Sequence, residues 1–182
     1  MRILPIIAAA LLALPAYADE VSDTLKSAIT AYEEGDIQYA LEELEFAKQK
    51  LLEMKTDSLG AFLPAAPEGW AFEKNSEMNT VLGMMGGGVG AEGVYTSADG
   101  TEIKVTLMAD NPMVASMGAM ITNAGAMGMK VERINRQRFA IQDEQMMSLV
   151  ANRILVQTEG DLDSARAVLE QMDFKAMAQF GQ

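Results

Sequence analysis

The spacing of apolar residues changes character once along the chain, at the turn-rich segment 63–69, which reads Leu-Pro-Ala-Ala-Pro-Glu-Gly. Before this segment, apolar residues recur every three or four positions, which is the period of an amphipathic helix. After it, alternating segments typical of half-buried strands stand between helical ones. The change of period, together with two prolines and a glycine, indicates a boundary. We therefore expect a helical hairpin over residues 19–62 and a sheet domain over residues 63–182.

The first eighteen residues have the three parts of a secretory signal peptide. Arg2 gives a positive start, an apolar run follows from Ile3 to Leu14, and Ala16-Tyr17-Ala18 supplies the small-residue cleavage pattern. The apolar run is shorter than the roughly 20 residues that a membrane span requires. We expect a signal peptide at residues 1–18, cleavage after Ala18, a periplasmic location and no membrane span.

The composition excludes several classes of function. The chain of 182 residues contains no His and no Cys, so it cannot supply a Ser-His-Asp triad, a Cys nucleophile or a zinc site of the usual ligands. Its formal charge of −12 argues against a nucleic-acid partner, because that binding depends on Lys and Arg. We therefore expect no cofactor, no metal and no enzymatic activity. A hydrolase that uses carboxylates or Ser is the disfavoured alternative.

Two helices are expected on either side of Gly35-Asp36. The apolar residues at helical spacing are Val21, Leu25, Ala28, Ile29 and Tyr32 before it, and Ile37, Ala40, Leu41, Leu44, Ala47 and Leu51 after it. Gly35 suits the left-handed residue that follows a helix, and Asp36 suits the N-cap of the next one. Helices joined by so short a turn are antiparallel, so we expect their apolar stripes to face each other.

This region resembles a known repeat. The string Ala31-Tyr32-Glu33-Glu34-Gly35-Asp36, followed by Ala40-Leu41 and Ala47, looks like the middle of a tetratricopeptide repeat, in which small residues let two helices pack closely. The resemblance covers roughly 30 residues and implies a helical hairpin with a role in protein contact. The sequence holds no second copy, whereas a stacked array needs about three, so no solenoid is expected.

The remaining chain reads as two groups of strands, each followed by a helix. The first group has strands over 69–75, 90–98 and 101–109, with a turn at Asp99-Gly100, and a helix over 113–127. The second has strands over 129–134, 138–142 and 146–158, then one helix with the stripe Leu162, Ala165, Leu169, Met172 and Ala176. The order βββα-βββα predicts an α+β fold, with a mainly antiparallel sheet and both helices packed on one side of it.

The string Pro67-Glu68-Gly69-Trp70 and this order of elements resemble the Mog1/PsbP-like family of α/β domains, over roughly residues 67–180. That family has no shared catalytic motif, and its members mostly act by binding partners. The resemblance therefore implies a binding role and carries no catalytic residue over to this chain.

Nine of the fifteen methionines lie between residues 78 and 129. The candidates for an apolar groove are Met84 and Met85 on a glycine-rich loop, and Met113, Met117, Met120 and Met127, which would share one face of a helix over 113–127. Flexible Met side chains suit an adaptable ligand groove or a packed core. Because thioether sulfur is a soft ligand, Cu(I) binding is an alternative.

A basic cluster stands out from this acidic chain. Within nine residues there are four cations and one acid, Glu132; the cations are Lys130, Arg133, Arg136 and Arg138. Arginine forks bind carboxylates and acidic surfaces, so we expect this cluster to bind a protein partner. If Val131, Phe139 and Ile141 point inward, then Lys130, Arg136 and Arg138 point outward.

Two other interpretations of the basic cluster stay open. Charged residues can protect the edge of a sheet from pairing with another chain. The cluster can also meet the helical hairpin, where residues 19–53 carry three lysines and ten acids, a net charge of 3 − 10 = −7, within one chain or across a homodimer. The leading hypothesis is an exported, non-enzymatic accessory protein that binds a protein partner or a small apolar ligand.

Overall fold

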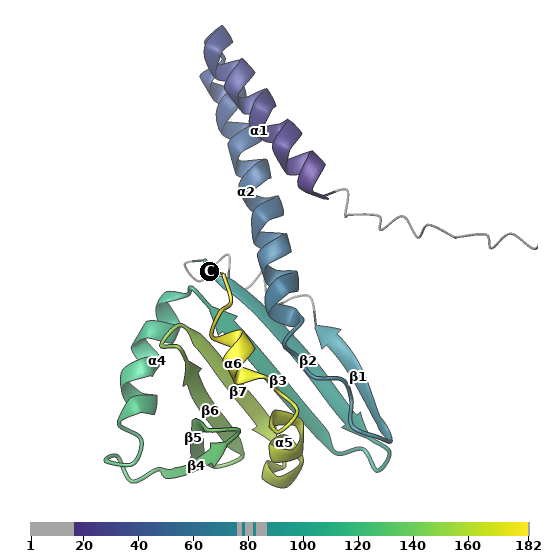
Figure 1. Ribbon diagram of the computed structural model, residues 1–182, viewed down its shortest axis with the longest axis vertical. Coiled ribbons are helices and arrows are strands. Elements are labelled where there is room, and N and C mark those ends of the chain that lie inside the picture. Colours follow the sequence, from purple (N-terminus) through teal and green to yellow (C-terminus); the bar gives the residue numbers. More distant parts are fainter. Residues whose placement is uncertain (1–16, 76–77, 79–81, 83–86, 182) are drawn as a thin grey trace, which may run out of the picture. The chain divides into compact units, whose positions relative to one another are not determined.

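The computed structural model describes residues 17–75, 78, 82 and 87–181 (Figure 1). The chain divides between Leu51 and Leu52 into two compact units, an N-terminal helix pair and a sheet domain. Residues 1–16 of the expected signal peptide lie outside the described ranges, as do Met84 and Met85. None of the helices in these ranges combines the length and the hydropathy that a membrane span requires.

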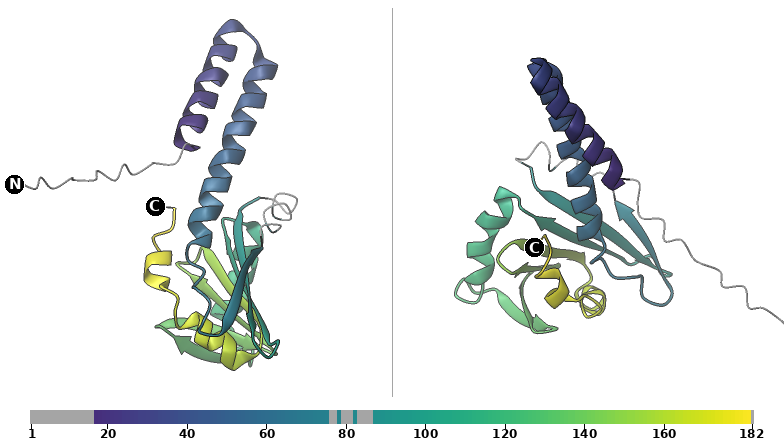
Figure 2. Two further views of the ribbon diagram at one scale, coloured as in Figure 1. Left: turned by 90° about the vertical axis from the view of Figure 1, so that its right-hand side faces the viewer. Right: turned by 45° about the horizontal axis from the view of Figure 1, so that its top comes forward.

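The helix pair consists of α1 (Tyr17–Glu34) and α2 (Ile37–Gly60), and both views in Figure 2 show the two helices side by side. Gly35 has a φ of 86°, and its N–H donates to the carbonyl of Tyr32 at 3.1 Å. The N–H of Asp36 donates to the carbonyl of Ala31 at 2.9 Å, while its carboxylate accepts from the N–H of Tyr39 at 3.1 Å. The expected left-handed residue and N-cap are therefore both confirmed.

The two helices bury mainly their small residues. Ala28, Ala31, Ala40 and Ala47 are buried, as is Val21. The seven larger residues of the two stripes are exposed: Leu25, Ile29, Tyr32, Ile37, Leu41, Leu44 and Leu51. The expectation that the whole apolar stripes face each other is therefore wrong. The small alanine side chains are thus the ones that the helix pair buries, and the larger apolar side chains stay at its surface.

The sheet domain contains seven antiparallel strands in the order β1-β2-β3-β7-β6-β5-β4, so β1 and β4 are the edges. The strands are β1 (Trp70–Asn75), β2 (Val89–Ser97), β3 (Glu102–Ala109), β4 (Lys130–Ile134), β5 (Gln137–Gln142), β6 (Gln145–Val150) and β7 (Ile154–Gly160). Every pair of neighbours is antiparallel. The α+β class and the antiparallel sheet are confirmed.

The expected strand over 146–158 is instead a hairpin of two strands. Val150 pairs with Ile154, and the carbonyl of Val150 accepts from the N–H of Arg153 at 3.0 Å. Ala151 and Asn152 close the loop with φ angles of 50° and 55°. The sequence pattern did not predict this turn, because apolar runs flank the loop and the loop contains no glycine.

Helices cover both faces of the sheet, and not one face as expected. Leu107 of β3 belongs to the core beneath α5 (Leu162–Leu169) and α6 (Phe174–Met177). Its neighbour Met108 belongs to a second cluster beneath α4 (Pro112–Thr122). Since successive residues of a strand point to opposite faces, α4 lies on one face and α5 with α6 on the other.

The helix ends also differ from the expected ones. Helix α4 ends at Thr122 and not at residue 127, and the last helix is interrupted between Leu169 and Phe174. The side chain of Asp173 accepts from the N–H of Ala176 at 2.9 Å and so begins α6. A polar N-cap residue therefore restarts the helix inside an otherwise continuous apolar stripe.

We expect Ala151→Gly to stabilise the sheet domain. A left-handed backbone conformation costs an L-residue about 1–2 kcal/mol. Glycine removes that cost but raises the conformational entropy of the unfolded chain, so the free energy of unfolding should increase by about 0.5–1 kcal/mol. Ala115→Gly, at an exposed position of α4, is the control and should lose about 1 kcal/mol. Urea unfolding measures both, and a loss of stability in Ala151→Gly would contradict the loop conformation.

Candidate functional site

The β4–β5 hairpin separates the four predicted basic residues onto different faces of the sheet. Its register pairs Arg133 with Arg138, Glu132 with Phe139 and Lys130 with Ile141. Phe139 and Ile141 belong to the core beneath α5, so Lys130 and Glu132 share that face. Val131, Arg133 and Arg138 lie on the face of α4. The expectation that Val131 shares a face with Phe139 and Ile141 is therefore wrong.

The three arginines stand close together in the hairpin. Arg133 and Arg138 are directly opposite each other on neighbouring strands, and Arg136 occupies the turn between those strands. All three side chains are exposed. Like charges in directly opposite positions destabilise a strand pair, so this arrangement has an energetic cost that a bound anion would relieve.

An interrupted ladder opens a pocket beside these arginines. The ladder between β5 and β6 covers only the pairs from Ala140–Met147 to Gln142–Gln145. Before it, the amide Nε2 of Gln137 donates to the hydroxyl of Ser148 at 2.7 Å and to the carbonyl of Leu149 at 3.1 Å. The hydroxyl of Ser148, which is fully buried, donates to the carbonyl of Arg138 at 2.6 Å. Hydrogen bonds from the side chains of Gln137 and Ser148 thus replace the backbone ladder where β5 and β6 separate.

The pocket has a volume of about 280 Å³ and combines apolar and polar walls. Its lining residues are Ile121, Thr122, Val131, Arg136, Gln137, Arg138, Ala140, Leu149 and Asn152. We call this set, together with Arg133, the arginine pocket. Guanidinium groups beside an apolar wall suit a ligand that joins a carboxylate to an apolar group.

Arg136 is held in a backbone conformation that favours glycine. Asn135 and Arg136 form the two-residue turn with φ angles of 48° and 69°. The amide of Asn135 donates to the carbonyl of Glu170 at 2.7 Å and to that of Met172 at 3.3 Å, which ties the turn to the end of α5. Turns of this type prefer Asn followed by Gly, so position 136 carries strain for its arginine side chain. Strain of this kind is typical of functional positions.

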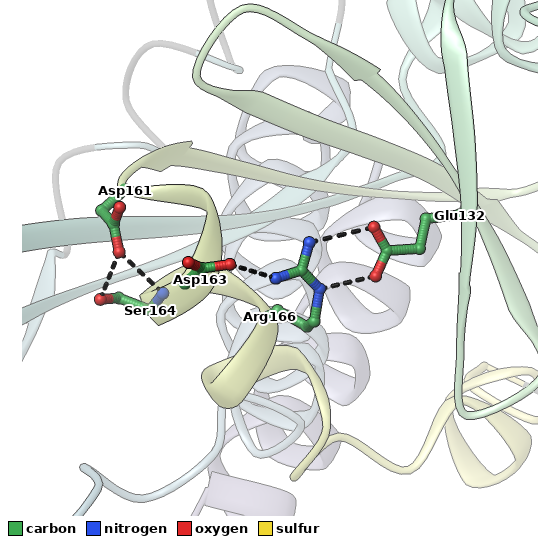
Figure 3. Close-up of polar contacts among 5 residues, drawn as sticks. All are labelled: Glu132, Asp161, Asp163, Ser164 and Arg166. Carbon is green, nitrogen blue, oxygen red and sulfur yellow. Dashed lines mark hydrogen bonds and ion pairs between the residues drawn. The ribbon is translucent and has the colours of Figure 1, made fainter.

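Glu132, the acid within the basic cluster, is paired with a different arginine (Figure 3). The fork of Arg166 in α5 donates to both oxygens of Glu132, from Nε at 2.6 Å and from Nη2 at 3.0 Å, and it also contacts Asp163. This fork lowers the pKa of the Glu132 carboxyl and, in return, raises the pKa of Arg166. Glu132 therefore leaves the charge of the arginine pocket uncompensated.

Within the ranges that the structure describes, no carboxylate forms an ion pair with Arg133, Arg136 or Arg138. The sheet edge explains part of this pattern, since Lys130 and Arg133 lie on the edge strand β4 and can protect it from pairing. It does not explain Arg136 in the turn or Arg138 on β5. These two residues are the strongest candidates for binding.

The expected methionine groove is brought together only in part. Met127 lies beyond the end of α4 and is 59% exposed, while the helix buries Val114, Gly118 and Ile121. Met117 and Met120 are half-buried, and they line an open pocket with Met147 of β6. Three thioethers at one pocket leave Cu(I) binding as a hypothesis, which competition with a Cu(I) chelator would decide. Met113 is half-buried outside this pocket.

The helix pair carries an apolar groove that the sequence pattern did not predict. It has a volume of about 390 Å³, and its lining residues are Ala28, Ile29, Tyr32, Ile37, Ala40, Leu41 and Leu44. We call it the hairpin groove. The signal was present, because each helix carries a stripe of small residues beside a stripe of large ones, and only one stripe can face the other helix.

No family model matches the chain, and the comparisons find no matching curated protein and no matching solved structure. Neither the tetratricopeptide-repeat resemblance nor the Mog1/PsbP-like one is therefore supported by an identified family. What is confirmed is the coarser statement, a helical hairpin followed by an antiparallel sheet domain.

We expect Glu132→Gln to reduce the dependence of stability on acid pH. The folded state lowers the pKa of Glu132 below the ordinary value of 4.5, so its contribution is present above that value and is lost as the pH falls through the folded pKa. The free energies of unfolding of wild type and Glu132→Gln should therefore differ most near pH 7 and converge as the pH falls below 4.5. Denaturant unfolding across this range measures the difference.

Glu73→Gln, at an exposed position of β1, is the matched control and should give a curve parallel to that of wild type. A constant difference between wild type and Glu132→Gln over the whole pH range would show that the Arg166 fork does not stabilise the ionised carboxylate.

Proposed function

We propose that this chain is an exported, non-enzymatic accessory protein that binds an acidic segment of another protein at the arginine pocket. Export rests on the signal-peptide pattern of residues 1–18. The binding role rests on one observation: Arg133, Arg136 and Arg138 stand together beside an open pocket with no described carboxylate to pair with them.

Charge and shape favour an acidic partner. A chain with a formal charge of −12 repels acidic surfaces in general, so a local group of three arginines is required to attract one. The Arg fork recognises carboxylates with two parallel hydrogen bonds. The apolar walls from Ile121, Val131 and Leu149 add contact for an apolar side chain next to the acid. The favoured ligand is therefore a segment that alternates acidic and apolar residues.

The lack of catalytic groups supports binding over turnover. His and Cys are absent from the sequence, and the described residues contain no group of three or more Asp and Glu side chains that could hold a metal ion. The pocket's polar groups are guanidinium, amide and hydroxyl groups, which orient a ligand but are poor proton-transfer groups near neutral pH.

The test uses the exported form that begins at Asp19 and a ten-residue peptide alternating Glu and Leu, followed by fluorescence anisotropy. We expect saturable binding that weakens with salt, and an affinity about tenfold lower for Arg136→Glu/Arg138→Glu, if each surface charge contributes about 0.7 kcal/mol.

Recovery from the periplasm of a chain that still carries residues 1–18 would contradict processing after Ala18.

Two controls distinguish specific binding at the arginine pocket from a general effect of the protein's net charge. Lys130→Glu makes the same type of charge change on the opposite face of the same hairpin and should leave the affinity unchanged. The peptide with Gln in place of Glu should not bind. Equal weakening by Lys130→Glu and by Arg138→Glu would refute a specific site at the arginine pocket.

A further inference from the structure

The two faces of the sheet are packed with different apolar residues. Of the described residues in the cluster beneath α4, half are methionines: Met78, Met108, Met117, Met120 and Met147. The core beneath α5 and α6 is larger, and its described methionines are Met146, Met172 and Met177. Both clusters bury apolar surface, and mainly branched and aromatic side chains fill the larger one. Burial alone therefore does not explain why methionines gather on the face of α4.

Three of these methionines line one pocket. Met117 and Met120 are three residues apart, so they are neighbours on one face of α4. Met147 stands on β6, on the face of the sheet that α4 covers. It is buried, while Met117 and Met120 are half-buried. The pocket has a volume of about 800 Å³ and is open to solvent. Its other lining residues are Gln142, Asp143, Glu144 and Gln145, and we call the whole set the methionine pocket.

The rim of the methionine pocket is acidic. Asp143 and Glu144 form the turn between β5 and β6, and both side chains are exposed. Its described lining residues include no Lys or Arg, and within the part of the chain that the structure describes neither acid takes part in an ion pair. This uncompensated negative charge attracts a cation and repels an anion.

The ligand atoms of the pocket favour a soft cation. Thioether sulfur binds soft metal ions such as Cu(I), whereas Mg²⁺ and Ca²⁺ require sets of oxygen ligands. The described residues contain no group of three or more Asp and Glu side chains that could supply such a set. Zinc sites use His and Cys, and the sequence has neither. The missing His and Cys thus exclude the usual zinc sites, but they do not exclude Cu(I).

We propose that Met117, Met120 and Met147 bind one Cu(I) ion in the methionine pocket. The three sulfur atoms are the ligands, and the carboxylates of Asp143 and Glu144 stabilise the positive charge. Because the pocket is open, the ion reaches the sulfur atoms directly from solvent. This proposal is independent of the acidic segment proposed for the arginine pocket, since the described lining residues of the two pockets do not overlap.

Anaerobic titration of the chain beginning at Asp19 with the Cu(I)–bicinchoninate complex tests this. We expect the protein at micromolar concentration to remove one equivalent of Cu(I) from the chelator, measured by absorbance. Met117→Leu/Met120→Leu should lower the affinity about 100-fold, because even groups that only support a metal ligand contribute about 10–100-fold. Leucine has a similar volume to methionine, so the cluster beneath α4 should stay packed, and circular dichroism checks this.

Two controls locate the site. Met127→Leu removes a thioether that is 59% exposed beyond the end of α4, and it should leave the affinity for Cu(I) unchanged. Asp143→Asn/Glu144→Gln keeps all three sulfur atoms. It should weaken binding less than the leucine substitutions do, and the loss should shrink as salt screens the charges.

A second measurement identifies the ligands. Ag(I) is a soft ion that is stable in air, and with methionine methyl groups labelled with carbon-13 it should shift the signals of Met117, Met120 and Met147 most. Shifts spread evenly over the methionines of the chain would overturn the proposal. No removal of Cu(I) from bicinchoninate, or wild-type affinity in Met117→Leu/Met120→Leu, would overturn it as well. Arg136→Glu/Arg138→Glu should bind Cu(I) as wild type does, so failure of the arginine pocket and failure of the methionine pocket can be told apart.

Discussion

The register of the β4–β5 hairpin is the constraint on which the proposed binding surface depends. The two-residue turn at Asn135-Arg136 sets Arg133 opposite Arg138, and the amide of Asn135 fixes that turn to the end of α5. A slip of one residue would exchange the faces, bringing the arginines to the core and Phe139 to the surface. The Arg166–Glu132 pair holds the same register from the opposite face. One turn and one ion pair thus decide where the positive charge lies.

The two units of the chain treat their apolar residues differently. The sheet domain covers both faces of its central strands with helices, so β3 is buried on both sides over residues 107–109 and β7 over residues 154–156. The helix pair instead uses alanines at the contact between its helices and leaves its larger residues exposed. The larger residues of the helix pair thus form an exposed apolar surface, whereas the surface proposed for binding on the sheet domain is positively charged.

Local turn chemistry explains which parts of the fold could be predicted from the sequence. Gly35-Asp36 and Asp99-Gly100 were expected as turns, and both glycines have positive φ in the structure. The turn at residues 151–153 was missed because Ala151 and Asn152 adopt positive φ without a glycine. The spacing of apolar residues and the turn residues therefore predicted the class of fold. They did not predict a strand boundary that lies inside an apolar run.

The sites were less predictable because they depend on pairing between distant segments. The cluster of basic residues was visible in the sequence, but its division between two faces needed the register of β4 with β5. The pocket could not be predicted without knowing that the ladder between β5 and β6 is interrupted, and that the side chain of Gln137 makes the hydrogen bonds there. Predicting the hairpin groove would have required knowing that the helix pair buries its alanines and leaves its larger apolar residues exposed.

The most direct test of the central claim compares stability with affinity in Arg136→Gly. Glycine fits the left-handed turn position and keeps the register, so this change removes the side chain and little else. If Arg136 serves binding, the variant should be more stable than wild type by about 0.5–1 kcal/mol and should bind the alternating Glu-Leu peptide more weakly. An unchanged affinity at increased stability would show that the arginine pocket is not the binding site.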